Sequence, residues 1–301
     1  MSKLKIITDS ASDITYAEEA AYNIRVIPFP IALGGKSYLS RVDFDNQGFY
    51  ALMNQHPDDL PTTSQVTPFQ FQEIIDEELA NGYDELLFLL INSRGSATYG
   101  NAVQARDLFF DEHPEQVGKV NISVIDSRGY SALYGYLAVE AAKRAQAGED
   151  LASVEAYVTQ ALEHRMIYFG IYSLKYAGKS GRIPSAAAFL GDKLGLKPVM
   201  KIFDHEITTA AKARGEARLI TSLADLVARD IDHGTPYQLI YGSAVEDLDK
   251  LRLAMEQKLG YGPTGAYQIG AAIAANAGPR AVGVAFGEGQ QPQTTNLMWM
   301  R

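Results

Sequence analysis

The chain contains no cysteine, and this absence excludes several kinds of chemistry. Without a thiol, the protein can form no disulfide and can hold neither a thiolate nucleophile nor a thiolate-bound metal. A chain without cysteine also suits a reducing compartment. No signal-peptide pattern opens the sequence, because Thr8-Asp9-Ser10 interrupts the apolar residues after Lys5 at once. These observations predict a cytoplasmic protein.

Basic residues and long apolar runs are scarce as well. The 301 residues include 27 Lys plus Arg against 36 Asp plus Glu, which gives a net charge of −9. An acidic chain with no basic run lacks the electrostatic footprint of a protein that binds DNA or RNA. The most apolar stretch, 269–286, is interrupted by Asn276, Pro279 and Arg280, so no transmembrane segment is expected.

The usual signatures of catalysis and metal binding are also missing. The histidines do not have the spacing of metal ligands, and neither H-E-x-x-H nor G-x-S-x-G occurs. Gly178-Lys179-Ser180 looks like the end of a phosphate-binding loop, but Ser173 occupies the position of the glycine that such a loop needs. We therefore expect no catalytic residue, no metal site and no cofactor. Lys175, Lys179 and Arg182 form a basic loop, either solvated or facing a phosphate or an acidic partner.

Short apolar runs alternate with helical patterns along the chain, which predicts an α/β fold. The run at 85–91 is almost continuously apolar, as in a strand of a parallel sheet that is buried on both faces. With 301 residues the chain can form two subdomains, and we place their boundary near residue 160, giving α/β subdomains at 1–160 and 161–301. The expected strands are 5–8, 25–33, 85–91, 121–125, 197–203, 206–210, 237–241, 267–269 and 282–286, with helices at 97–110, 132–147, 152–164 and 245–259.

Hydroxyl side chains gather just before the helix expected after residue 67. Thr67-Pro68-Phe69-Gln70 is already a complete helix start, with a Thr N-cap, Pro at the first position and Gln at the capping-box position. Thr62, Thr63 and Ser64 are therefore not needed for capping. Hydroxyls and free N–H groups at a helix start suit the carboxylate or phosphate end of a ligand, although an ordinary Ser/Thr turn has the same composition. Ser96 has the same two interpretations, as a helix cap or as a ligand contact.

Seven short segments in one order span nearly the whole chain: KIITDSASD (5–13), PTTSQ (61–65), SRGSATY (93–99), VIDS (124–127), GRIPSA (181–186), LKPV (196–199) and GPRAVG (278–283). Together they resemble the motifs of the DegV family, the fatty-acid-binding proteins with the EDD fold. The resemblance implies two EDD-like α/β subdomains, a mostly parallel N-terminal sheet, and a long-chain fatty acid bound in the cleft between the subdomains.

The resemblance also implies residues that hold the ligand. Family members hold the carboxyl end with the Thr of a Thr-Ser-Gln motif and the Ser of a Ser-Gly-Thr motif, which correspond here to Thr63 and Ser96. Ser64 would support the first turn, and Ala97 replaces the usual Gly of the second. The family commonly has His before the Gly-Pro turn, whereas this chain has Asn276. Asn276 cannot become a cation, so it either changes the preference for a carboxylate or is simply a turn residue.

Some family members present their fatty acid to a separate kinase, and the resemblance therefore implies a fatty acid kinase as a partner. Arg182, Lys197 and Arg214 are the candidate contacts for that partner or for a phosphate. The basic segment that contains Arg214 is diluted by Glu216.

Two other functions remain open from the sequence. One is a hydrolase or transferase that uses Asp9, Ser10 and Asp126 at strand ends, where α/β sheets place their ligands; both aspartates also suit caps of the following turns. The other is an adaptor that dimerises through the apolar end of the chain around Trp299.

Overall fold

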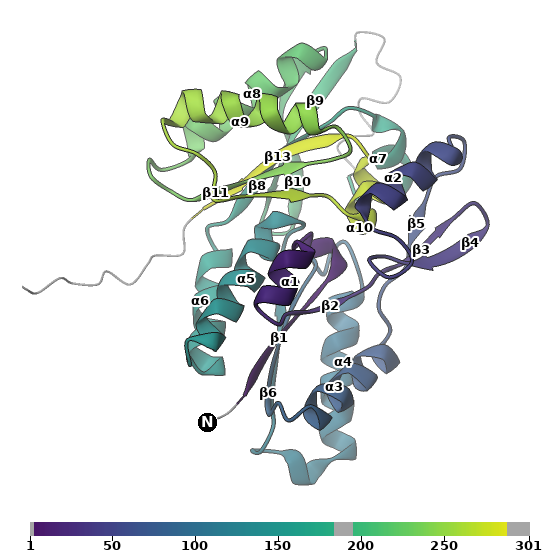
Figure 1. Ribbon diagram of the computed structural model, residues 1–301, viewed down its shortest axis with the longest axis vertical. Helices are drawn as coiled ribbons and strands as arrows, with labels where there is room; N and C mark the ends of the chain where they lie inside the picture. The colour runs from purple at the N-terminus through teal and green to yellow at the C-terminus, as the bar shows by residue number, and fades with distance from the viewer. Residues whose placement is uncertain (1–2, 184–194, 288–301) are drawn as a thin grey trace, which may run out of the picture.

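The computed structural model describes residues 3–183 and 195–287. Two sheets dominate it, one in each half of the chain (Figure 1). The expected α/β class with a parallel N-terminal sheet and a second sheet is confirmed. The apolar end around Trp299 and residues 184–186 of the GRIPSA segment lie outside the described residues. Among the described helices, none has both the length and the hydropathy to cross a membrane.

The N-terminal sheet has four parallel strands in the order β2-β1-β6-β7. Alternate residues of β6 explain its unbroken apolar run, because Leu86, Phe88 and Leu90 face the helices α3 and α4, whereas Leu87 and Leu89 face the opposite core. The elements of this layer are β1 (Leu4–Asp9), η1 (Ser10–Ser12), α1 (Tyr16–Ala21), β2 (Arg25–Ile27), α3 (Pro68–Ala80), β6 (Glu85–Leu90), α4 (Thr98–Glu112), η2 (Pro114–Gln116), β7 (Asn121–Asp126), α5 (Ala132–Gln146) and α6 (Leu151–Leu162).

The second sheet has six strands in the order β10-β9-β8-β13-β11-β12, and its neighbours are antiparallel except for β11 and β12. Helices α8 and α9 cover one face, and the other face joins a hydrophobic cluster shared with the N-terminal half. The elements are β8 (Met166–Ile171), α7 (Leu174–Ser180), β9 (Leu196–Phe203), β10 (Glu206–Arg214), α8 (Glu216–Asp230), β11 (Tyr237–Tyr241), α9 (Val245–Leu259), β12 (Gly265–Gln268), α10 (Ala271–Ala277) and β13 (Ala281–Phe286). The boundary near residue 160 stays a prediction.

A small antiparallel sheet, in the order β4-β3-β5, carries the first hydroxyl segment. It consists of β3 (Pro30–Leu33), β4 (Lys36–Leu39) and β5 (Thr62–Thr63), and α2 (Asn46–Gln55) lies between β4 and β5 in the chain. Thr63 pairs with Ile31, so the backbone of β3 fixes the place of that hydroxyl.

Two local expectations were wrong. The strand expected over 25–33 is divided at Phe29, because Pro28 and Pro30 on either side have no N–H for a sheet ladder and the N–H of Phe29 donates to the hydroxyls of Ser10 and Ser40. The first piece joins the parallel sheet and the second joins the small sheet. The basic loop expected at 175–182 is largely the helix α7, with Ser173 as its N-cap.

Candidate functional site

A cavity of about 460 Å³ lies between the two sheets. This volume falls within the range of roughly 300–1,000 Å³ that is usual for small-molecule sites. The walls are largely apolar and come from both halves of the chain. The apolar lining residues include Phe29, Ile91, Ile167, Phe169, Ile183, Ile202, Ile207, Ile240, Ile269 and Ile273.

Polar groups line part of the same cavity, and the four of them that were expected to contact a ligand come from three places in the fold. Thr63 and Ser64 lie at and just after β5, Ser96 lies in the loop between β6 and α4, and Asn276 lies on α10. Helix α10 packs directly against β5, which brings these segments together. The four residues expected to contact a ligand thus line one cavity; that they hold a ligand stays a prediction.

Thr98, which the sequence analysis gave no role, ties the two hydroxyl segments together. Its buried Oγ1 accepts from the N–H of Val66 at 3.3 Å and lies 2.9 Å from Oγ of Ser96. The side chain of Asn101 donates to the carbonyl of Val66 at 2.7 Å, a second link between the segments. These bonds hold Val66, just after the first hydroxyl segment, against the start of α4.

The start of α3 confirms that its cap needs only Thr67 and Gln70. Oγ1 of Thr67 accepts from the N–H of Gln70 at 3.3 Å, and Oε1 of Gln70 accepts from the N–H of Thr67 at 3.0 Å. Ser96 does serve its own turn, since its Oγ accepts from the N–H of Thr98 at 3.3 Å. If the Thr98 hydroxyl donates to Ser96, the Ser96 O–H remains available to donate into the cavity.

The three basic residues expected at a partner surface do not share one place. Arg182 borders the cavity, and its guanidinium donates to the carbonyl of Ser180 at 3.0 Å. Lys197 and Arg214 do not line the cavity; they lie at the end of the β9–β10 pair that is opposite the turn, and Lys197 donates to the carbonyl of Tyr172 at 2.6 Å.

The two lysines of α7 hold the loop that precedes β5. Nζ of Lys175 donates to the carbonyl of Pro57 at 2.6 Å, and Nζ of Lys179 donates to that of Leu60 at 3.2 Å. Both lysines therefore connect α7 to the loop that leads to Thr63. Their contacts are with backbone carbonyls and do not resemble those of a phosphate-binding loop.

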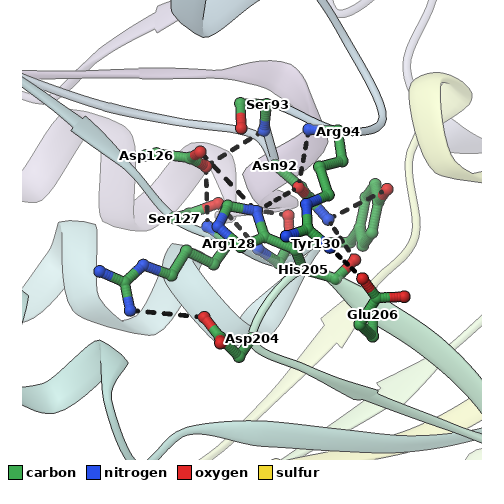
Figure 2. A network of polar contacts seen from close by, with 11 residues as sticks. Asn92, Ser93, Arg94, Asp126, Ser127, Arg128, Tyr130, Asp204, His205 and Glu206 are labelled. Carbon is green, nitrogen blue, oxygen red and sulfur yellow. Dashed lines mark hydrogen bonds and ion pairs between the residues drawn. The ribbon is translucent and has the colours of Figure 1, made fainter.

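A polar network at the cavity rim, which we call the clasp, joins the loops after β6 and β7 to the turn between β9 and β10 (Figure 2). The side chain of Asn92 donates to the carbonyl of His205 at 3.0 Å, and Nδ1 of His205 lies 2.9 Å from Oδ1 of Asn92. The N–H of His205 donates to the carbonyl of Arg128 at 3.0 Å. Two exposed ion pairs complete it, Arg94–Glu206 and Arg128–Asp204.

A second polar connection, which we call the buried junction, joins the N-terminal half to the segment from β12 to α10. Oδ1 of Asp13 accepts from the N–H of Gly270 at 2.8 Å. Tyr50 donates to the carbonyl of Ile269 at 2.5 Å, and Asn46 donates to that of Gln268 at 3.1 Å. Desolvation by burial raises the pKa of Asp13 to about 7. The junction fixes the start of α10, which forms a wall of the cavity.

The hydrolase or transferase hypothesis relies on Asp9, Ser10 and Asp126. In the structure their side chains form hydrogen bonds that stabilise the turns after the strands. Asp9 is fully buried and accepts from the N–H groups of Ala11 and Ile91 and from the Tyr134 hydroxyl. Burial raises its pKa to about 6. Ser10 bonds to Ser40. These three residues do not line the cavity.

Asp126 has a similar structural part. Its Oδ1 accepts from the N–H of Ser93 at 3.1 Å and from that of Arg128 at 2.9 Å.

Among the residues that the structure describes, no three His, Asp or Glu side chains gather as metal ligands would.

These features define an α/β protein with a lined cavity between two sheets, and comparisons place it in a family. The family model described as "Uncharacterised protein, DegV family" matches residues 3–288. A curated relative, the DegV domain-containing protein TTE1491 of Caldanaerobacter subterraneus subsp. tengcongensis, is 32% identical over 290 residues, which cover 96% of this chain and 100% of the relative. The chain belongs to the DegV family.

Solved structures show the same fold. A protein of Eubacterium ventriosum described as a stearic acid-binding protein matches with a TM-score of 0.86 and 22% identity, over 96% of this chain and 98% of that one. A DegV family protein of Thermus thermophilus, described with fatty acid binding, matches with a TM-score of 0.82 and 24% identity, over 95% of this chain and 100% of that one.

Proposed function

We propose that this protein binds one long-chain fatty acid in the cavity between its sheets. The observation that carries the proposal is the combination of a long apolar lining with hydroxyl groups gathered from β5 and the start of α4. Several solved structures of the same fold are described as fatty-acid-binding proteins. The proposed role is binding rather than catalysis.

The energetics favour such a ligand. Burying hydrocarbon contributes about 0.8 kcal/mol per CH₂, so a sixteen-carbon chain supplies on the order of 10 kcal/mol before the entropy costs of binding. The chain can therefore provide most of the affinity. The hydroxyls of Thr63 and Ser96 then fix the carboxyl end, with Ser64 supporting the turn beside them.

The test is to extract purified protein with organic solvent and identify bound lipids by mass spectrometry. By this proposal we expect about one fatty acid per chain. Thr63→Ala or Ser96→Ala should each lower the affinity roughly tenfold, because one lost hydrogen bond is worth about 1–1.5 kcal/mol. Thr62→Ala is the matched control, because Thr62 is exposed on the same strand and does not line the cavity. Protein that is empty and takes up no C14–C20 acid would contradict the proposal.

The finer proposal is that the bound acid is presented to a fatty acid kinase. Arg182 supports it, since this exposed cation borders the cavity beside the turn between β9 and β10. Mixing the loaded protein with such a kinase and ATP should phosphorylate the bound acid. Arg182→Ala should lower that rate while leaving the lipid content unchanged, and Arg252→Ala, an exposed arginine on α9, is the control. No phosphorylation by any kinase tried, with lipid bound, would leave lipid binding as the whole function.

A further inference from the structure

The amide of Asn276 bears on which head group the cavity accepts. We propose that the site binds single-chain lipids whose head group is uncharged and can both donate and accept a hydrogen bond, namely the protonated form of a fatty acid or a primary fatty amide. The inference rests on the proposed function and specifies the ligand class of the same site.

The backbone of α10 fixes how this amide is turned. Nδ2 of Asn276 donates to the carbonyl oxygen of Ala272, one helical turn earlier, at 2.8 Å. A carbonyl can only accept, so the nitrogen and the oxygen of the side chain cannot be exchanged. Asn276 therefore retains Oδ1, an acceptor, and one N–H of Nδ2. Within 3–183 and 195–287, Oδ1 has no hydrogen-bond partner, and the residue lines the cavity.

An acceptor on a residue that lines the cavity discriminates between the two forms of a fatty acid. Both oxygens of a carboxylate only accept, so a carboxylate beside Oδ1 leaves that oxygen unpaired and adds repulsion between partial negative charges. A protonated carboxyl group donates its O–H to Oδ1 and accepts the remaining N–H. A primary amide head group can form the same pair of bonds. Asn276 thus favours a neutral head group.

The hydroxyl groups that line the cavity do not reverse this preference. The hydroxyls of Thr63, Ser64 and Ser96 can donate or accept, so they serve either form. Every other residue of α10 is Ala or Ile, and none carries a charge. A carboxylate in an apolar cavity is disfavoured unless several donors or a buried cation meet it, and burial raises its pKa.

Within 3–183 and 195–287, the charged groups named below that border this end of the cavity are exposed or already paired. Arg182 is exposed, so water and salt weaken its field. Arg94 is paired with Glu206, and Lys175 and Lys179 of α7 donate to backbone carbonyls. Two tyrosines of the described residues also lie here: burial raises the pKa of Tyr130 to about 12, and desolvation also raises the pKa of Tyr176, which packs on Gly278.

The first test reads the protonation state of the bound acid directly. Protein is loaded with palmitic acid labelled with ¹³C at the carboxyl carbon, and the carbon resonance is followed by NMR from pH 5.5 to 9. We expect the chemical shift of a protonated acid at pH 7, with a titration midpoint above 7. The shift of a carboxylate at pH 7 would overturn the inference.

The second test uses a neutral analogue. At pH 8.5 we expect palmitamide to bind at least tenfold more tightly than palmitate, and Asn276→His, which supplies a donor that can become a cation, to reduce that ratio at least tenfold. Asn54→His is the matched control: Asn54 is also the second-last residue of its helix, α2, but it is exposed and outside the cavity. Equal ratios in both variants would contradict the assignment to Asn276.

The two proposals fail differently. If neither palmitate nor palmitamide binds at any pH, the proposed function is wrong. If palmitate binds as an anion and palmitamide binds more weakly, the proposed function stands and the inference about Asn276 is wrong.

Discussion

The two polar connections between the halves of the molecule are built differently. In the buried junction, Asp13 is hidden from solvent and bonds to the N–H of Gly270. In the clasp (Figure 2), ion pairs flank the network. The side chains of Arg94 and Glu206 are 62% and 63% exposed. Exposed ion pairs contribute about 0–1 kcal/mol, whereas an orphaned buried polar group costs about 1–3 kcal/mol. The comparison therefore predicts that the cavity opens at the clasp and pivots at the junction.

The largest effect should come from breaking the junction. Asp13→Ala leaves the buried N–H of Gly270 without its acceptor, and we expect a loss of about 1–3 kcal/mol in the free energy of unfolding. Chemical denaturation measures it. Asp249→Ala, at an exposed position of α9, should change the stability by less than about 0.5 kcal/mol. Similar losses in the two variants would mean that the buried junction does not stabilise the fold more than an exposed surface position does.

The same aspartate gives the junction a pH dependence. Burial raises the pKa of Asp13 to about 7 from 3.8, so between these values the folded protein binds a proton that the unfolded chain has released. The stabilisation that comes from this proton on Asp13 is fully present below pH 3.8 and is lost as the pH rises through 7. Asp9, with its pKa raised to about 6, acts in the same direction. Asp13→Asn should flatten the decline in stability between pH 4 and 7, and an unchanged slope would contradict this assignment.

A smaller change in stability, with a clear kinetic signature, should follow from loosening the clasp. His205→Ala removes the ring that bonds to Asn92, and we expect a loss of about 0.5–1.5 kcal/mol. If the clasp is the opening side, lipid association and dissociation should both become several-fold faster, leaving Kd unchanged. Stopped-flow measurements with a fluorescent fatty acid test this, with the exposed His164→Ala as control. A change in Kd through the dissociation rate alone would instead make His205 a ligand contact.

The smallest effect should come from the exposed ion pair itself. Glu206→Ala removes the partner of Arg94 and should change stability by less than about 0.5 kcal/mol. Its effect on lipid exchange should disappear at 1 M salt, where exposed charges are screened within about 3 Å. A change that persists at high salt would show that packing, rather than charge, holds the clasp.

The sequence predicted the fold where the pattern is local. The apolar run of β6 and the spaced apolar residues of α9 suffice for their assignment, and α9 has the predicted limits. Helix α10 was missed because AAIAANA is buried nearly all round and has no amphipathic period. The break at Phe29 had a local signal, Pro28 and Pro30, that the strand assignment did not use, whereas the hydroxyls of Ser10 and Ser40 that accept from Phe29 are distant in sequence.

The candidate site followed the same rule. Thr63 and Ser64 stood out because the start of α3 did not need them for capping, a purely local argument. Asp13 and Gly270 are separated by 257 positions, and no pattern in one sequence pairs them. The role of Thr98 as a bridge was equally hidden, since a buried threonine inside a motif looks like ordinary helix capping.

The cavity interrupts the hydrophobic cluster that both halves share, since Ile91, Ile167 and Ile202 belong to both. An occupant of that space replaces absent core side chains and touches both halves. Any molecule that binds only the folded form stabilises it, by about 2.7 kcal/mol when its free concentration is one hundred times Kd. By the proposed function, the lifetime of the folded protein would follow the supply of lipid: scarcity would raise the unfolded fraction and expose the chain to proteases.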